Sequence, residues 1–246
     1  MRTAERVFKR GEISLKTLGL IGGMSWESTL VYYKALNEQV KIHLGGLHSA
    51  ECILYSVDFA RIEAMQRSGK WEEAGEELAD IARKLEKAGA EAVVLCTNTM
   101  HKVAFRMEET IAVPFLHLAQ VTADRITGDS VGKVLLLGTK YTMEEDFFFN
   151  RLTAAGLDVY IPDKDEREEI NRIIFQELCL GKIRESSQQK VRDIIKVYKE
   201  KYEIEAVILG CTELEQLFRE GEEPGVRLYD TTEIHIKAAA DFMLGG

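Results

Sequence analysis

Two short stretches of the chain are nearly copies of each other. EAVVLCTNT occupies residues 91–99, and EAVILGCTE occupies residues 205–213. A second pair precedes them, LGLIGG at residues 18–23 and VLLLGT at residues 134–139. Each stretch is a continuous apolar run that stops at glycine or polar residues, and helical patterns lie between the runs. This alternation is typical of parallel strands covered on both faces. The sequence therefore predicts an α/β protein made of two similar halves.

The repeat also predicts where a ligand binds. We expect two half-domains, each a parallel sheet flanked by helices, related by a pseudo-twofold axis. Ligands of such sheets bind beyond the carboxyl ends of the strands, so the active site is expected between the halves. The order of the elements places residues 16–113 and 228–246 in the first domain and residues 114–227 in the second. Residues 1–15 are polar and precede the first strand, so they are expected to be a flexible tail.

Charge and cysteine content limit the function further. The net charge of −9 argues against general binding of nucleic acid or of an anionic membrane, and no apolar run approaches the roughly 20 residues of a membrane span. The four cysteines are Cys52, Cys96, Cys179 and Cys211. None forms a C-x-x-C pair or has zinc-ligand spacing to a histidine, so no metal is expected. With no secretory signal, we expect a cytoplasmic protein with reduced thiols.

The alignment of the two copies singles out one cysteine. When Glu91 is matched to Glu205, Thr97 matches Cys211. A residue at a strand end and just before a helix lies in the field of the helix N-terminus, which lowers a thiol pKa from about 8.5 toward neutrality. Cys211 is then a plausible base or nucleophile. The alternative is a buried, inert cysteine, the role that we also expect for Cys179 in its helix.

Three motifs together resemble a known family. GLIGGMSWEST at residues 19–29, LCTNTMH at residues 95–101 and GCTEL at residues 210–214 resemble the aspartate/glutamate racemase superfamily, in its aspartate racemase branch. The resemblance runs from about Lys16 to the end of the chain. It implies a cofactor-independent amino-acid racemase, with no pyridoxal phosphate and no metal, whose small-molecule substrate lies between the two halves. Relatives of this kind are often homodimers.

One position departs from the family pattern. Members of the family use two cysteines on opposite faces of the substrate α-carbon, one as a thiolate base and one as an acid. Cys211 matches the second cysteine, whereas Thr97 stands in place of the first. A hydroxyl is a much weaker acid than a thiol, and it is no base near pH 7. The resemblance therefore implies an asymmetric site with a kinetic preference for the L-enantiomer of aspartate or glutamate.

The resemblance also suggests residues that bind the substrate. The first group, expected to hold a carboxylate, is Thr97, Asn98 and Thr99. The second group, expected at the amino-acid end, is Thr212 and Glu213. Further positions come from loops and are Met24, Gln66 and Lys182. Three of these have alternatives. Glu213 either orients the thiol or caps a helix. Gln66 is alternatively a solvated polar residue, and Lys182 is alternatively a charge that interacts favourably with the dipole at a helix C-terminus.

Other functions stay open from the sequence alone. A site with one cysteine also suits a related isomerase or decarboxylase that acts on a small dicarboxylate. The chain is alternatively a non-catalytic amino-acid binder that kept the cleft without turnover. His101, at the end of the LCTNTMH motif, either tunes the site, binds substrate or is a partly buried helix residue.

Overall fold

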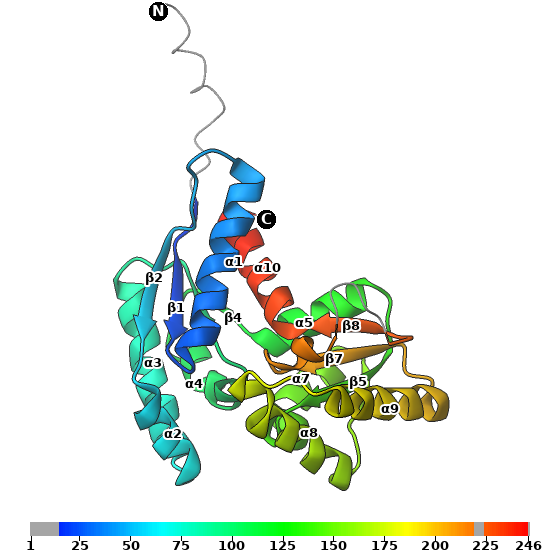
Figure 1. Ribbon diagram of the computed structural model, residues 1–246. Helices are drawn as coiled ribbons and strands as arrows, with labels where there is room; N and C mark the ends of the chain where they lie inside the picture. Colours follow the sequence, from blue (N-terminus) through cyan, green and yellow to red (C-terminus); the bar gives the residue numbers. More distant parts are fainter. Residues whose placement is uncertain (1–14, 219–223, 246) are drawn as a thin grey trace, which may run out of the picture.

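The computed structural model describes residues 15–218 and 224–245. The expected tail of residues 1–15 lies outside this range, except for Leu15. Within the described residues, the chain forms two four-stranded parallel sheets with helices on their faces, as the repeat predicts (Figure 1). No helix in this part of the chain is both long enough and apolar enough to cross a membrane.

The two sheets have the same topology. The first has the order β2-β1-β3-β4 and the second the order β6-β5-β7-β8, so each strand has a counterpart four strands later. The strands are β1 Leu18–Gly22, β2 Cys52–Ser56, β3 Ala92–Leu95, β4 Phe115–Leu116, β5 Lys133–Gly138, β6 Asp158–Tyr160, β7 Ala206–Gly210 and β8 Arg227–Asp230. The near-copies in the sequence thus form the central strands, β1 and β3 in one sheet and β5 and β7 in the other.

Helices cover both faces of each sheet. The α-helices are α1 Trp26–Leu44, α2 Phe59–Arg67, α3 Trp71–Lys87, α4 Ala104–Glu108, α5 Leu118–Gly128, α6 Lys140–Glu144, α7 Asp146–Ala154, α8 Lys164–Gln176, α9 Glu185–Tyr202 and α10 Thr231–Leu244. Short 3-10 helices are η1 Thr99–Val103, η2 Leu178–Leu180 and η3 Leu214–Leu217. Strands β1, β3 and β7 are wholly buried, and so is β5 after its first residue Lys133, which explains why these strands are apolar runs rather than alternating patterns.

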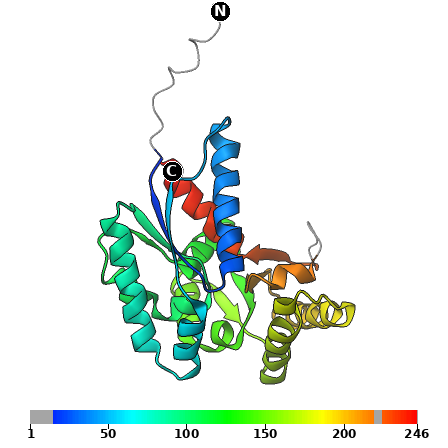
Figure 2. The same ribbon diagram turned by 60° about the vertical axis from the view of Figure 1, so that its left-hand side comes forward.

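Each half has a separate core on each face of its sheet. In the first half, α3 and α4 cover one face and α1 and α10 the other. In the second half, α8 and α9 cover one face, and α5 and α7 cover the other. Figure 2 shows the first half from the side, with α1 and α10 along the same face of its sheet.

The chain crosses between the sheets at two points. After Pro114, the short strand β4 pairs with β3, through Val93 opposite Phe115, and so belongs to the first sheet. Near the end of the chain, β8 pairs with β7 and belongs to the second sheet. Both strands lie on the other side of the domain limits expected at residues 113/114 and 227/228. A short apolar segment gives no sequence signal for the sheet that it joins, which explains the difference.

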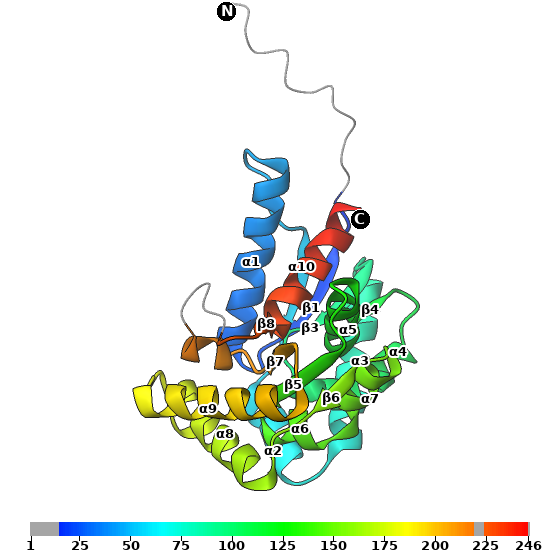
Figure 3. The ribbon, with the colours of Figure 1, turned by 90° about the vertical axis from the view of Figure 1, so that its right-hand side faces the viewer.

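The last helix returns to the first half. Helix α10 begins directly after β8 but packs against α1, and it also lies against α5 (Figure 3). The Lys16 amide, next to the first strand, donates a hydrogen bond of 3.0 Å to the Met243 carbonyl near the end of α10. The two halves are therefore interlocked by α5 and α10, which meet between them.

Candidate active site

The two motif loops begin where the central strands end. Strand β3 stops at Leu95, directly before the loop with Thr97, and β7 stops at Gly210, directly before Cys211. Each loop leads into a 3-10 helix rather than into a long α-helix. A single short turn has a small dipole, so the field that we expected to act on Cys211 is weak.

The loops approach each other through one threonine. The Asn98 amide lies 3.4 Å from Thr231 Oγ1, and this hydroxyl donates a hydrogen bond of 2.9 Å to the Leu209 carbonyl. Asn98 follows β3, whereas Leu209 lies two residues before Cys211 in β7. The structure thus brings the ends of the two central strands to one place. Thr231 was not identified from the sequence, although the polar DTT at residues 230–232, directly after a strand, was a usable signal.

Cys211 is held by its own loop. Its thiol donates a hydrogen bond of 3.0 Å to Glu213 Oε2, and the Thr212 hydroxyl donates one of 2.7 Å to the same oxygen. Only 9% of Cys211 is exposed. Burial, together with the charge of Glu213, raises the pKa of the Cys211 thiol well above its ordinary value. The prediction of a lowered thiol pKa is wrong for this structure, because burial and an adjacent carboxylate outweigh a weak helix dipole.

Two other predicted residues lie on the first half. Met24, after the glycine turn of β1, is 4% exposed and belongs to the core under α3. The Gln66 amide, near the end of α2, lies 2.8 Å from the sulfur of Met100, which follows Thr99 in η1. Gly23 sits in this turn with φ +92°, and a Cβ there would lie 2.3 Å from the Val57 carbonyl oxygen. The turn therefore needs glycine.

Lys182 lies in the turn that follows η2. It is exposed in the turn between η2 and α9, and its amide donates to the Glu177 carbonyl. The buried Glu177 carboxylate holds this turn by accepting from Arg172 at 2.7 Å and from Ser187 at 2.6 Å. Among the described residues, Lys182 forms no hydrogen bond or ion pair with the loops that carry Thr97 and Cys211.

Cys179 lies nearer to the second motif than its sequence suggests. Helix α8 ends at Gln176, so the helical periodicity breaks and Cys179 is exposed. The prediction that it is a core residue is wrong for this reason. The residue is exposed as a whole, but its thiol is partly desolvated, and this desolvation, together with the charge of Glu213, raises the pKa of Cys179 to about 11.

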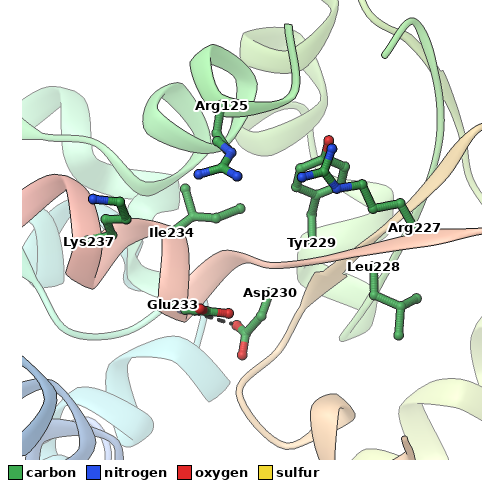
Figure 4. Close-up of a pocket in the computed structure, with 8 residues that line it drawn as sticks. All are labelled: Arg125, Arg227, Leu228, Tyr229, Asp230, Glu233, Ile234 and Lys237. Carbon is green, nitrogen blue, oxygen red and sulfur yellow. Dashed lines mark hydrogen bonds between the residues drawn. The ribbon is translucent and has the colours of Figure 1, made fainter. Parts of the chain in front are cut away.

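A separate hollow of about 200 Å³ lies at the start of α10 (Figure 4). It is lined by Arg125, Arg227, Leu228, Tyr229, Asp230, Glu233, Ile234 and Lys237, none of which is a predicted site residue. Its cations already have partners. Arg125 and Arg227 lie 3.0 Å and 3.1 Å from Asp129 Oδ2, and Lys237 lies 3.0 Å from Asp241.

Known proteins match this chain over most of its length. A model of the Asp/Glu/hydantoin racemase family matches residues 21–239. A crystal structure from Yersinia pestis, assigned to the Asp/Glu racemases, is 50% identical and has a TM-score of 0.90, over 94% of this chain and 100% of that one. A crystal structure of an aspartate racemase homologue from Pyrococcus horikoshii is 37% identical, with a TM-score of 0.83 and the same coverage.

A curated relative matches over a shorter stretch. The broad-specificity amino-acid racemase RacX of Bacillus subtilis is 30% identical over 95 residues. This stretch is 39% of the present chain and spans 41% of the relative.

Proposed function

The chain belongs to the Asp/Glu/hydantoin racemase family, and on that premise we propose that it is a racemase of aspartate or glutamate. Cys211 is the base on one face of the substrate α-carbon, and Thr97 is the proton donor on the other. The observation that carries the proposal is the contact of Cys211 with Glu213 at the end of β7, at the strand end that Asn98 approaches from the other half. The proposed chemistry needs no coenzyme and no metal.

Glu213 explains how a thiol with a raised pKa acts as a base. In the proposed reaction, the thiol proton moves to Glu213 Oε2, 3.0 Å away, and leaves a thiolate. The positive α-ammonium of a bound amino acid then stabilises this thiolate. The thiolate takes the α-proton, and the electron pair of the broken C–H bond stays on the α-carbon and its carboxylate. Glu213 is thus assigned to the thiol more than to the substrate.

The second half of the reaction occurs at Thr97. Its hydroxyl gives a proton to the opposite face of the α-carbon and forms the new C–H bond. The alkoxide then regains a proton through solvent, while Glu213 releases one. An alcohol is about as weak an acid as water, so Thr97 is a poor acid and no base near neutral pH. Abstraction from the Cys211 side is therefore the faster direction, which supports the preference for L-amino acids.

Substrate contacts are proposed from the same loops. Asn98 and Thr99 are half-buried at the end of β3 and are proposed to hold one carboxylate, and Thr212, in the loop after β7, is proposed to hold the amino-acid end. Met24 and Gln66 border the first loop, and Lys182 is the candidate for a side-chain carboxylate. The homodimer stays a prediction of the family resemblance, and the cytoplasmic location stays a prediction from the cysteine pattern of the sequence.

Deuterium exchange tests the proposal directly. The protein is incubated in D₂O with L- or D-aspartate and with L- or D-glutamate, and label at the α-carbon is followed by NMR. We expect exchange into L-substrate first, slower inversion, and loss of both in Cys211→Ala. A Thr97→Ala variant should keep exchange but lose inversion. Binding of the amino acid without any exchange would overturn the proposal and favour a non-catalytic binder.

A further inference from the structure

His101 joins the Thr97 loop to the crossover between the halves. Its Nδ1 lies 2.7 Å from the Thr97 carbonyl, and its Nε2 lies 3.2 Å from the Leu118 amide nitrogen. A carbonyl only accepts and an amide N–H only donates, so both partners fix the ring as the neutral tautomer with its proton on Nδ1. Leu118 opens α5, directly after the chain leaves the first sheet. The ring therefore attaches the motif loop to this crossover.

The Thr97 hydroxyl depends on the backbone for its position. The Thr97 amide donates a hydrogen bond of 2.9 Å to the Leu95 carbonyl, and the Thr97 carbonyl accepts from His101. In the part of the chain that the structure describes, the hydroxyl itself forms no hydrogen bond. The direction of the side chain thus follows its peptide group, and the His101 ring fixes one end of that group.

The Cys211 side is held in a different way. There, the Glu213 carboxylate contacts the thiol directly, and both residues belong to the same loop. Within residues 15–218 and 224–245, His101 forms no hydrogen bond or ring contact with Cys211 or Glu213. A change at His101 should therefore move Thr97 and leave Cys211 in place.

Its surroundings keep the His101 ring rigid. Only 2% of it is exposed, and its centroid lies 4.7 Å from that of His117 and 5.8 Å from that of His235. Burial, with His235 nearby, lowers the pKa of His101 to about 3. The ring therefore stays neutral at ordinary pH, and both of its hydrogen bonds persist.

We propose that His101 is a positioning residue, whose Nδ1–H holds the Thr97 carbonyl so that the Thr97 hydroxyl faces the substrate, and whose Nε2 anchors this loop to the start of α5. This role rests on the proposed racemase function. It predicts that loss of the Nδ1 donor weakens proton delivery from Thr97 without weakening proton removal by Cys211.

Two substitutions separate the two hydrogen bonds of the ring. His101→Gln places an amide oxygen near the position of Nε2 and keeps an acceptor for Leu118, but it loses the donor to Thr97. His101→Asn places an amide N–H near the position of Nδ1 and keeps that donor. The matched control is His235→Gln, a buried histidine of the same cluster that binds the Leu116 carbonyl and Tyr32 rather than the motif loop.

The readout compares two rates on the preferred L-amino acid in D₂O. One is α-deuteration with retention of configuration, which needs Cys211 and Glu213 but not Thr97, and the other is formation of the D-enantiomer, which also needs Thr97. We expect His101→Gln to slow inversion about 10- to 100-fold, the order of loss from small misplacement of a catalytic group, and to change retention exchange less than about threefold. His101→Asn and the His235 control should keep the ratio of the two rates near that of the unsubstituted protein.

Each result decides between the two proposals. If the unsubstituted protein inverts its substrate but His101→Gln lowers both rates by the same factor, the positioning role is wrong and the racemase proposal stands. If the unsubstituted protein shows neither exchange nor inversion, the racemase proposal fails and the role of His101 fails with it. Should His101→Gln not fold, His101→Asn still decides, because a lowered ratio of inversion to exchange in that variant contradicts the role of the Nδ1 donor.

Discussion

Acidification should destabilise the fold, because three buried histidines are neutral in it. His101, His117 and His235 are at most 4% exposed. Burial lowers the pKa of His101 to about 3 and of His235 to about 4, and it moves the pKa of His117 far below its usual range. The Arg151 guanidinium, paired with Glu108, further disfavours a charge on His101 and His117.

The sign follows from proton uptake. A histidine has a pKa of about 6.5 in the unfolded chain, so below that pH the unfolded state binds more protons than the folded state. The stability that these neutral rings contribute is complete above about pH 6.5 and is lost as the pH drops below that value. The free energy of unfolding falls by about 1.36 kcal/mol per pH unit and per histidine once the pH is below about 6.5. Lowering the pH from 7 to 5 therefore costs about 2 kcal/mol for each histidine, or about 6 kcal/mol for the cluster.

One carboxyl group acts in the opposite direction. Burial and the adjacent Glu215 raise the pKa of Asp230 to about 7, so the folded state holds an extra proton at pH 5. This group regains about 2 kcal/mol over the same interval. The carboxylates with lowered pKa, such as Glu205, titrate mainly below pH 5 and add little. The net loss is about 3 to 4 kcal/mol, a large part of a typical stability of about 5–15 kcal/mol.

Urea unfolding at pH 7 and pH 5 measures this loss. We expect the free energy of unfolding to fall by about 3 to 4 kcal/mol, with net uptake of about two protons on unfolding near pH 5.5. His235→Gln should flatten the pH dependence by about one proton while lowering stability at pH 7. A stability equal or higher at pH 5, or proton release on unfolding, would refute the reasoning that the cluster is neutral.

Three further predictions concern single side chains. Thr97→Cys should raise turnover of the D-enantiomer about 10- to 100-fold relative to the L-enantiomer, since a thiol then serves both faces; initial rates by polarimetry measure this, and an unchanged ratio contradicts it. Glu213→Gln should slow α-deuterium exchange about 100-fold and move its pH optimum upward, because Cys211 loses its base; an unchanged rate and optimum would exclude this role. Phe148→Ala, at a wholly buried ring in α7, should cost about 3–5 kcal/mol in urea unfolding, and Phe147→Ala, at a half-buried ring, clearly less; equal losses would show that the packing is misassigned.

Much of the fold could be predicted from the repeat. Continuous apolar runs such as residues 92–95 and 206–209 are long enough to indicate buried parallel strands, and the matching order of elements indicates two related sheets. The membership of β4 could not be predicted, because two apolar residues after Pro114 carry no periodicity and pair only through tertiary packing. The membership of β8 could not be predicted either, because its pairing with β7 is also set by tertiary packing.

The candidate site could be predicted in its residue types but not in its electrostatics. The positions of Thr97 and Cys211 follow from the alignment of the two copies. The pKa of Cys211 does not, because it depends on burial and on the rotamer of Glu213, which are properties of the packed structure. Thr231 was missed for a related reason. It lies about 20 residues after Cys211 in the sequence, and only the packed structure brings its hydroxyl to the Leu209 carbonyl of β7.

The return of α10 to the first half has a consequence for biosynthesis. Residues Ile236, Ala239, Ala240 and Met243 cover Leu18, Leu20, Tyr32 and Leu36, which are made more than 190 residues earlier. While the ribosome is still translating the second half, one apolar face of the first sheet is therefore covered by α1 but lacks the cover of α10. Nascent protein should be prone to capture by chaperones at this face until the final helix emerges.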